Sequence, residues 1–70
     1  MKNSIRTLRE ERGLTQGALA ERLGVSRQTV NALETGKYDP SLPLAFKLSA
    51  LFAQPIDAMF DPELPEESAR

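Results

Sequence analysis

The sequence predicts an all-α fold in a single domain, and three features of its 70 residues lead to that prediction. Glycine follows three segments with helical apolar periodicity, at the position where a left-handed residue commonly ends a helix. Serine or threonine precedes three such segments, as a helix N-cap does. No segment shows the apolar–polar alternation that is typical of a half-buried strand. The pattern predicts five helical segments.

The first two helices are defined by the residues at their ends. We expect the first over residues 3–12 and the second over residues 16–23, each followed closely by a glycine. Thr15 is a suitable N-cap for the second helix. Leu19 and Leu23 then lie on one face of that helix and are expected to point into the core.

The third helix follows after a short turn. Ser26 is its expected N-cap, the helix covers residues 27–35, and Gly36 ends it. The turn over residues 24–26 has three residues, which suits two helices that meet at a steep angle. Residues 16–35 therefore predict a helix, a turn and a second helix.

Two further helices and a charged tail complete the chain. The fourth helix is expected over residues 41–52, with Pro43 tolerated in its first turn, and the fifth over residues 56–60. The last ten residues, 61–70, contain two prolines and five charged residues and are expected to form a frayed tail. The predicted organisation is a domain over residues 1–60 followed by this acidic tail.

Charge is divided unevenly along the chain. Residues 1–56 contain eight Lys or Arg and five Asp or Glu, hence +3, whereas residues 57–70 contain one Arg and five Asp or Glu, hence −4. The total charge of −1 therefore hides a basic body. Because attraction to phosphate depends on where the cations lie, this balance is compatible with nucleic-acid binding.

The composition removes several other functions. The chain has no cysteine and no histidine, so it lacks disulfides, the usual zinc ligands and the common nucleophile–base pairs of enzymes. We therefore expect no enzyme activity, no metal and no cofactor. No apolar run approaches the roughly 20 residues that cross a bilayer, and the N-terminus does not resemble a signal peptide. A cytoplasmic protein of a bacterium or phage is expected, associated with the nucleoid and not with a membrane.

The third helix carries the candidate DNA-reading residues. Val30 and Leu33 lie together on one side and are expected to be buried. The opposite side carries groups that can read base edges: Arg can pair with guanine, Gln and Asn with adenine, and Ala can meet the thymine methyl. The predicted base-reading residues are Arg27, Gln28, Asn31 and Ala32. By themselves these side chains are equally compatible with a solvated polar surface, and the predicted turn favours the DNA-reading interpretation.

Other polar residues are expected to face the DNA backbone. The first turns of the second and third helices expose backbone N–H groups, which favour an anion such as phosphate. The predicted phosphate-binding residues are Thr15, Gln16, Ser26, Thr29, Thr35, Lys37 and Tyr38. Tyr38 has an alternative role as a lid packed over the fourth helix, and the two roles are compatible.

Glu34 lies in the last turn of the third helix, where a negative charge is unfavourable because it faces the negative end of the helix dipole. A cation is therefore expected beside it. Arg9, next to Leu8 on the first helix, is the best candidate. The two residues predict a structural ion pair between the first and third helices.

Several motifs together resemble a known family. Residues 14–38 contain LTQ, then LGVSRQTVN, then ETGKY, and PSL follows at residues 40–42. This pattern resembles the XRE or lambda-repressor-like helix-turn-helix family, over roughly residues 3–60. The resemblance implies a compact five-helix domain that binds specific double-stranded DNA, commonly as a homodimeric repressor. It implies phosphate contacts for Gln16 and Lys37, base contacts for Arg27, Gln28 and Asn31, and the Arg9–Glu34 pair.

Three positions depart from the family pattern. Gly17 stands where relatives have a helix former and costs about 0.5–1 kcal/mol relative to Ala. Ala53 stands where relatives commonly have a glycine stop, and Pro55 where they have a Ser or Thr cap. We therefore expect the path into the fifth helix to differ from that of the relatives.

The fourth helix has more apolar residues than one face of a helix in a small monomer needs. Self-association is therefore expected, through an interface formed by Phe46, Ala50, Leu51, Ile56, Met59 and Phe60. The alternative is that these side chains fill the core. A two-fold dimer would place two reading helices about 34 Å apart on a pseudo-palindromic operator. The rival function is a protein-interaction module, such as an antitoxin or adaptor, on the same fold.

Overall fold

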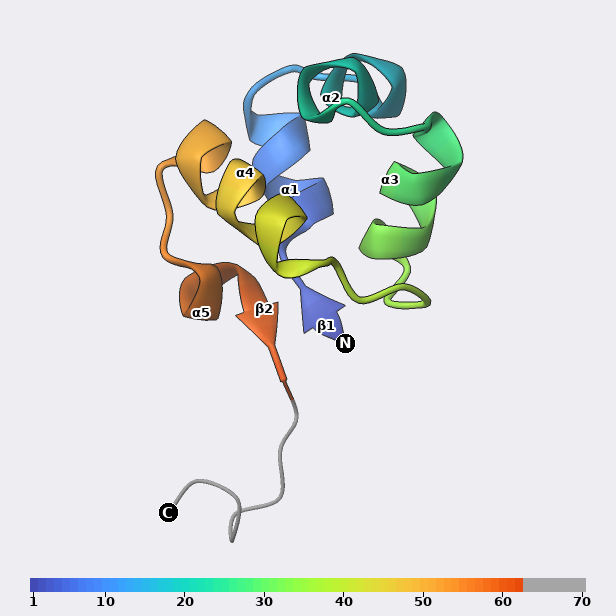
Figure 1. The fold of residues 1–70 in the computed structure, drawn as a ribbon. Coiled ribbons are helices and arrows are strands. Elements are labelled where there is room, and N and C mark those ends of the chain that lie inside the picture. Colours follow the sequence, from blue (N-terminus) through green and yellow to red (C-terminus); the bar gives the residue numbers. More distant parts are fainter. Residues whose placement is uncertain (63–70) are drawn as a thin grey trace, which may run out of the picture.

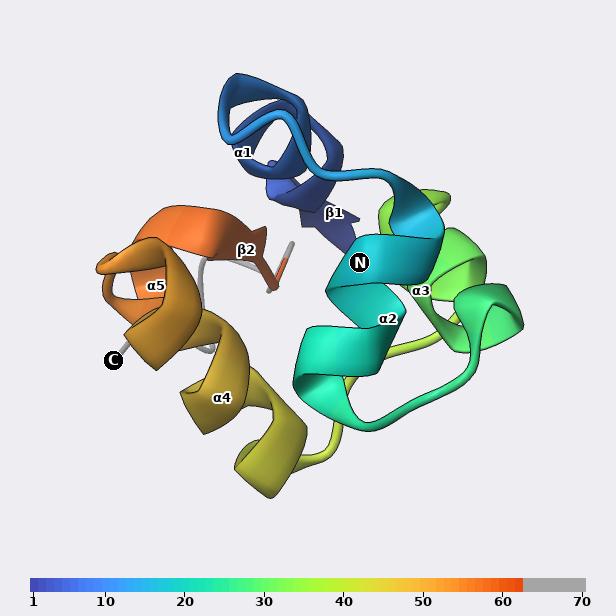
Figure 2. The same cartoon turned by 90° about the horizontal axis from the view of Figure 1, so that it is seen from above.

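The computed structural model describes residues 1–62, which form five helices and two short strands (Figure 1). In chain order these are β1 (Lys2–Asn3), α1 (Ile5–Glu11), α2 (Gln16–Leu23), α3 (Arg27–Glu34), α4 (Leu42–Phe52), α5 (Ile56–Met59) and β2 (Phe60–Asp61). In both views α3 lies on the opposite side of the molecule from α5 (Figures 1 and 2). The predicted five-helix, all-α class is confirmed.

Three helices begin at the side-chain caps that the sequence predicts. The Thr15 hydroxyl accepts a hydrogen bond from the Ala18 amide at 3.0 Å, and the Ser26 hydroxyl accepts one from the Thr29 amide at 3.1 Å. The Ser41 hydroxyl does the same for the amide of Leu44 at 3.2 Å. Each cap satisfies an N–H group that has no partner within its helix and is typically worth about 1 kcal/mol.

The two strands were not expected. β1 and β2 pair antiparallel, with Lys2 opposite Asp61 and Asn3 opposite Phe60. The first helix therefore begins at Ile5 instead of residue 3, and the fifth ends at Met59 because the backbone of Phe60 is extended. Strands of two residues are too short to show an alternating pattern, which explains why the sequence did not indicate them.

Strand β2 also affects the predicted boundary at residue 60. Asp61, the first residue of the predicted acidic tail, pairs with β1 and is part of the folded unit. Pro62 follows it and is exposed, and residues 63–70 of the predicted tail lie outside the described residues.

A single core joins all five helices and β2. Its buried side chains are Ile5, Leu19, Ala20, Leu23, Val30, Leu33, Leu44, Leu48, Phe52, Met59 and Phe60. Val30 and Leu33 are fully buried, as predicted for the inner side of the third helix. Packing these apolar side chains away from water is the main source of stability in a domain of this size.

The core also includes two of the six predicted interface residues. Met59 is 2% exposed and Phe60 is 6% exposed, so both are buried within this chain. Ile56 and Leu51 are half-buried, whereas Ala50 and Phe46 are exposed. For Met59 and Phe60 the structure thus agrees with the alternative that they fill the core.

The C-terminal end of α4 has an unusual backbone. Ala53 adopts the left-handed conformation, with φ 53° and ψ 44°, at the position where a glycine is the common stop. Arg12, the residue that follows α1, donates hydrogen bonds to the carbonyl oxygens of Leu51 (3.0 Å) and Phe52 (3.1 Å). Arg12 thereby satisfies two carbonyl groups that the end of the helix leaves without a partner.

Candidate nucleic-acid interface

Helix α3 has one buried side and one polar, exposed side. Val30 and Leu33 anchor the helix on the core, while Arg27, Gln28 and Asn31 are exposed. Within residues 1–62 these three polar side chains make no hydrogen bond or ion pair. Their hydrogen-bonding groups are therefore free to bind an external partner.

Ala32, the fourth predicted base-reading residue, is half-buried. Lys37 and Tyr38 fold back toward the end of α3. Both of their amides donate to the Ala32 carbonyl oxygen, at 3.0 and 3.2 Å. Ala32 can thus offer a small apolar contact, but no hydrogen bond.

The Arg27 side chain reaches from the start of α3 to the first turn of α2. A Cβ atom built on Gly17 would lie 3.9 Å from the Thr15 hydroxyl oxygen and 4.0 Å from Cδ of Arg27. The Arg27 side chain therefore lies beside the N-terminal turn of α2. A cationic side chain beside the N-terminal turn of a helix is a combination that favours an anion.

Four predicted phosphate-binding hydroxyls are used inside the protein. Those of Thr15 and Ser26 cap helices, and the Ser26 oxygen also lies 2.9 Å from the Thr29 hydroxyl. The hydroxyl of Thr35 donates to the carbonyl oxygens of Asn31 and Ala32 at 3.0 and 3.3 Å. These hydroxyls therefore stabilise the two helices, whatever they contact outside the chain.

The segment after α3 exposes a cation and a phenol. Lys37 is exposed, and its side chain makes no hydrogen bond or ion pair within the described part of the chain. Tyr38 is 42% exposed, and its hydroxyl makes no hydrogen bond within the described part of the chain. Both follow Gly36, which has φ +77° and ends the helix as predicted.

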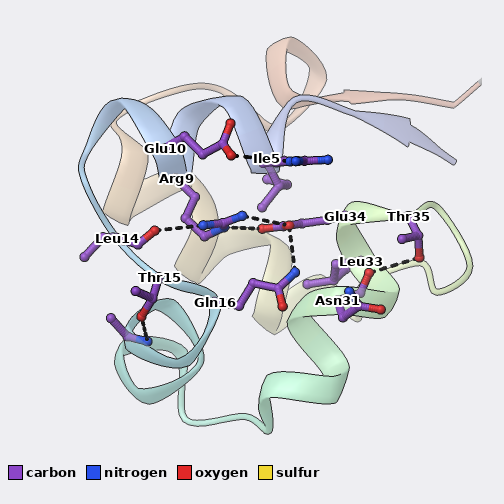
Figure 3. A network of polar contacts seen from close by, with 12 residues as sticks. Ile5, Arg9, Glu10, Leu14, Thr15, Gln16, Asn31, Leu33, Glu34 and Thr35 are labelled. Carbon is purple, nitrogen blue, oxygen red and sulfur yellow. Dashed lines mark hydrogen bonds and ion pairs between the residues drawn. The ribbon is translucent and has the colours of Figure 1, made fainter.

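Glu34 connects three helices through its carboxylate (Figure 3). Nε of Arg9 donates to Oε2 at 2.5 Å and Nη2 to Oε1 at 3.2 Å, so the arginine binds both oxygens. The side-chain amide of Gln16 also donates to Oε1, at 3.0 Å. The remaining Nη1 of Arg9 donates to the Leu14 carbonyl oxygen at 2.8 Å. The structure thus brings Arg9 and Glu34 together as predicted, and adds Gln16 to the pair.

Burial explains the role of this cluster. The Arg9 side chain is 11% exposed and that of Glu34 is 4% exposed. The hydrogen bond to Glu34 raises the pKa of Arg9, and the opposite charge of Glu34 acts in the same direction. Each of the three guanidinium nitrogens of Arg9 already donates a hydrogen bond within the chain, and the Gln16 amide is partly committed to Glu34. The cluster therefore fixes the positions of α1, α2 and α3 relative to one another.

Sequence reasoning missed one polar residue at this surface. The side-chain amide of Asn3 donates to the carbonyl oxygen of Leu33, in the last turn of α3, at 2.7 Å. The two residues are 30 positions apart, and no local pattern could have indicated the contact. Within residues 1–62, no group of three His, Cys, Asp or Glu residues could hold a metal ion, and no helix could span a membrane.

Comparison with known proteins agrees with this geometry. A helix-turn-helix family profile matches residues 5–58. An uncharacterized HTH-type transcriptional regulator of Methanocaldococcus jannaschii is 53% identical over 60 residues, which cover 86% of this chain and 91% of the relative. A second, from Methanothermobacter thermautotrophicus, is 52% identical over 61 residues, covering 86% and 88%.

A bacterial relative has a similar extent. The HTH-type transcriptional regulator YgzD of Bacillus subtilis, also uncharacterized, is 45% identical over 60 residues, which cover 86% of this chain and 91% of YgzD. The similarity therefore extends across archaea and bacteria, and it does not support the narrower expectation of a bacterial or phage source. The family profile spans residues 5–58 and so includes both helices of the motif. This chain belongs to the XRE-like helix-turn-helix family.

Proposed function

We propose that this protein is a transcriptional repressor that binds a pseudo-palindromic DNA operator as a homodimer. Membership of the helix-turn-helix family already makes it a DNA-binding regulator and not an enzyme. One observation carries the finer proposal. Arg27, Gln28 and Asn31 project from the exposed side of α3 without partners among the described residues, opposite a fully buried anchor.

These side chains have the chemistry for reading bases in the major groove. Arg27 can donate two hydrogen bonds to guanine, and Gln28 or Asn31 can both donate to and accept from adenine. Ala32 can meet a thymine methyl group. The helix is eight residues long and is held from behind by the core, which suits insertion of its exposed side into the groove.

Contacts with the DNA backbone would come from both sides of this helix. Lys37 supplies a free cation after α3, with Tyr38 next to it, and the N-terminal turns of α2 and α3 supply backbone N–H groups. Gln16 and the hydroxyls of Thr15, Ser26, Thr29 and Thr35 are the further phosphate contacts that we propose. Such contacts position the protein on any sequence, while the α3 side chains select among sequences.

Self-association is proposed through α4 and α5. Leu42 and Phe46 of α4 are 64% and 59% exposed, and Ala50 continues the same line at a spacing of four residues. Half-buried Leu51 and Ile56 adjoin this surface in sequence. Because α5 lies opposite α3 (Figures 1 and 2), a two-fold contact there leaves both reading helices uncovered. Met59 and Phe60 would support this interface from the core.

The remaining expectations are kept as proposals. We propose that the protein acts in the cytoplasm on nucleoid DNA. We also propose that residues 1–60 form the DNA-binding domain, together with Asp61 at the end of β2. Occupation of a site that overlaps a promoter is the simplest mode of action for one small helical unit. This mode requires no effector, and the level of binding then follows the concentration of the protein.

The test is selection of bound fragments from a random DNA pool, followed by titration of the selected site at several salt concentrations. We expect half-sites centred about one helical turn apart and an affinity that falls steeply as salt rises. Arg27→Ala should reduce the preference for the selected site over scrambled DNA, whereas Lys37→Ala should weaken all sequences alike. Arg6→Ala removes an exposed cation of α1 and is the matched control. A folded protein without preference for any site would support the adaptor or antitoxin alternative.

A further inference from the structure

Asn3 is the residue where three parts of the fold meet. Its side-chain amide donates to the Leu33 carbonyl oxygen at 2.7 Å and to the Met1 carbonyl oxygen at 3.3 Å. Its side-chain oxygen accepts a hydrogen bond from the Ile5 amide at 3.1 Å, and this bond caps the start of α1. Its backbone pairs with Phe60 in β2. Asn3 therefore joins the end of α3 to the start of α1 and to the strand pair.

The contact with Leu33 differs from the other contacts of α3. Arg9 and Gln16 hold α3 through the flexible side chain of Glu34. Asn3 instead reaches from β1 to the main chain of α3 with its side chain. A main-chain contact restricts the helix axis itself, because no rotatable side-chain bonds lie between the contact and the helix.

The N-terminal segment also lies close against the end of α3. A Cβ atom built on Gly36 would lie only 3.1 Å from the Met1 carbonyl oxygen. The Leu33 carbonyl oxygen also accepts a hydrogen bond from the Gly36 amide at 3.1 Å. The carbonyl group that Asn3 binds therefore belongs to the turn that ends the helix. The last turn of α3 is therefore held between its own closing turn and β1.

We propose that Asn3 is a positioning residue for sequence recognition, which sets the orientation of the C-terminal half of α3 in the DNA groove. The proposal rests on the proposed DNA-reading role of α3. Asn31 lies two residues before Leu33, whereas Arg27 lies at the far end of the helix. A small tilt after loss of the Asn3 contact would displace Asn31 more than Arg27. Hydrogen bonds to base edges weaken steeply when their geometry changes.

The main test uses Asn3→Asp, which keeps the oxygen that caps α1 and removes the amide that binds Leu33. Ser4→Ala is the matched control, because the Ser4 hydroxyl contacts only the Met59 carbonyl, at 3.5 Å, and does not reach α3. In the DNA-free protein we expect N3D to speed hydrogen exchange of the Gly36 and Lys37 amides by about three- to tenfold, the range for one neutral hydrogen bond. Ser4→Ala should leave both exchange rates unchanged.

Binding to variants of the selected site provides the second readout. The quantity compared is the ratio of affinities for the selected site and for a site changed at one base. At the base contacted by Asn31, which Asn31→Ala identifies, N3D should lower this ratio by about three- to tenfold. At the base contacted by Arg27, which Arg27→Ala identifies, the ratio should change little. The added negative charge lowers affinity for all sequences alike, so it cancels in this ratio. Asn3→Ala adds no charge and should give the same pattern.

Two results would overturn the proposal. One is unchanged exchange and unchanged discrimination in folded N3D and N3A. The other is unfolding of both variants at room temperature, because Asn3 would then serve the stability of the fold and not the orientation of α3. If the wild-type protein shows no DNA preference at all, the proposed function fails, and the exchange experiment still decides whether Asn3 restrains the end of α3.

Discussion

Arg9 of α1 binds both carboxylate oxygens of Glu34 on α3, and both side chains are almost completely buried. The pair offsets the unfavourable position of an acidic residue in the last turn of a helix. Because the pKa of Arg9 is raised in the folded chain, its contribution to stability is fully present below the unfolded pKa of arginine. That contribution is lost only as pH rises through the higher, folded pKa, so we expect no alkaline loss from this pair near neutral pH.

Removal of one partner should be strongly destabilising. Arg9→Met leaves the buried Glu34 carboxylate without its counter-ion, and we expect a loss of about 3 kcal/mol or more in the free energy of unfolding. Urea denaturation, monitored by circular dichroism, measures this loss. Arg6→Ala, which breaks the exposed pair with Glu10, is the control and should change stability by less than about 1 kcal/mol. Equal effects of the two variants would contradict a structural role for the buried pair.

Replacing Ala53 with glycine should stabilise the fold. Its left-handed backbone costs about 1 kcal/mol in an L-residue with a side chain, and glycine adopts it without that cost. We expect Ala53→Gly to raise the free energy of unfolding by up to about 1 kcal/mol. Ala50→Gly, within the same helix, should lower it by a similar amount, because glycine is unfavourable inside helices. Thermal unfolding of both variants tests the opposite signs, and destabilisation by Ala53→Gly would refute the expectation.

Gly17 and Gly36 should respond in opposite directions to alanine. At Gly17 a new Cβ meets only ordinary contacts at 3.9 and 4.0 Å, so Gly17→Ala should stabilise α2 by about 0.5–1 kcal/mol. Gly36 has φ +77° and would place its Cβ 3.1 Å from the Met1 carbonyl oxygen, so Gly36→Ala should destabilise by about 1–2 kcal/mol. Chemical denaturation measures both. A gain in stability for both variants would contradict the expectation for Gly36, because the Met1 carbonyl oxygen and the positive φ would then not oppose a side chain at that position.

Phe46 should matter for association and little for folding. It is 59% exposed, so Phe46→Glu should change the stability of the monomer by less than about 0.5 kcal/mol. A glutamate placed within an apolar two-fold contact lies near its own copy and should convert dimer to monomer in sedimentation experiments. Gln54→Glu, which adds the same single charge at an exposed position just after α4, is the control. Unchanged association of Phe46→Glu would place the interface elsewhere.

Local sequence was sufficient for the helices and for the polar side of α3. Thr15, Ser26 and Ser41 cap helices as expected, because a cap depends on an amide only three residues away. Burial of Val30 and Leu33 opposite Arg27 follows from the helical repeat alone. The Arg9–Glu34 pair could be proposed because an acidic residue at a helix C-terminus requires a cation and because the family pattern suggested the same partner.

Tertiary packing decided the contacts between distant residues. The β1–β2 pair joins the two ends of the described chain, Asn3 binds Leu33 across 30 positions, and Gln16 reaches Glu34 across 18. Packing also buried Met59 in this chain's core, although its helical spacing alone allowed a place in an interface. Periodicity shows which side of a helix is apolar, but not which surface covers that side. Only the assembled fold determines that, because such contacts form after segments far apart in sequence have come together.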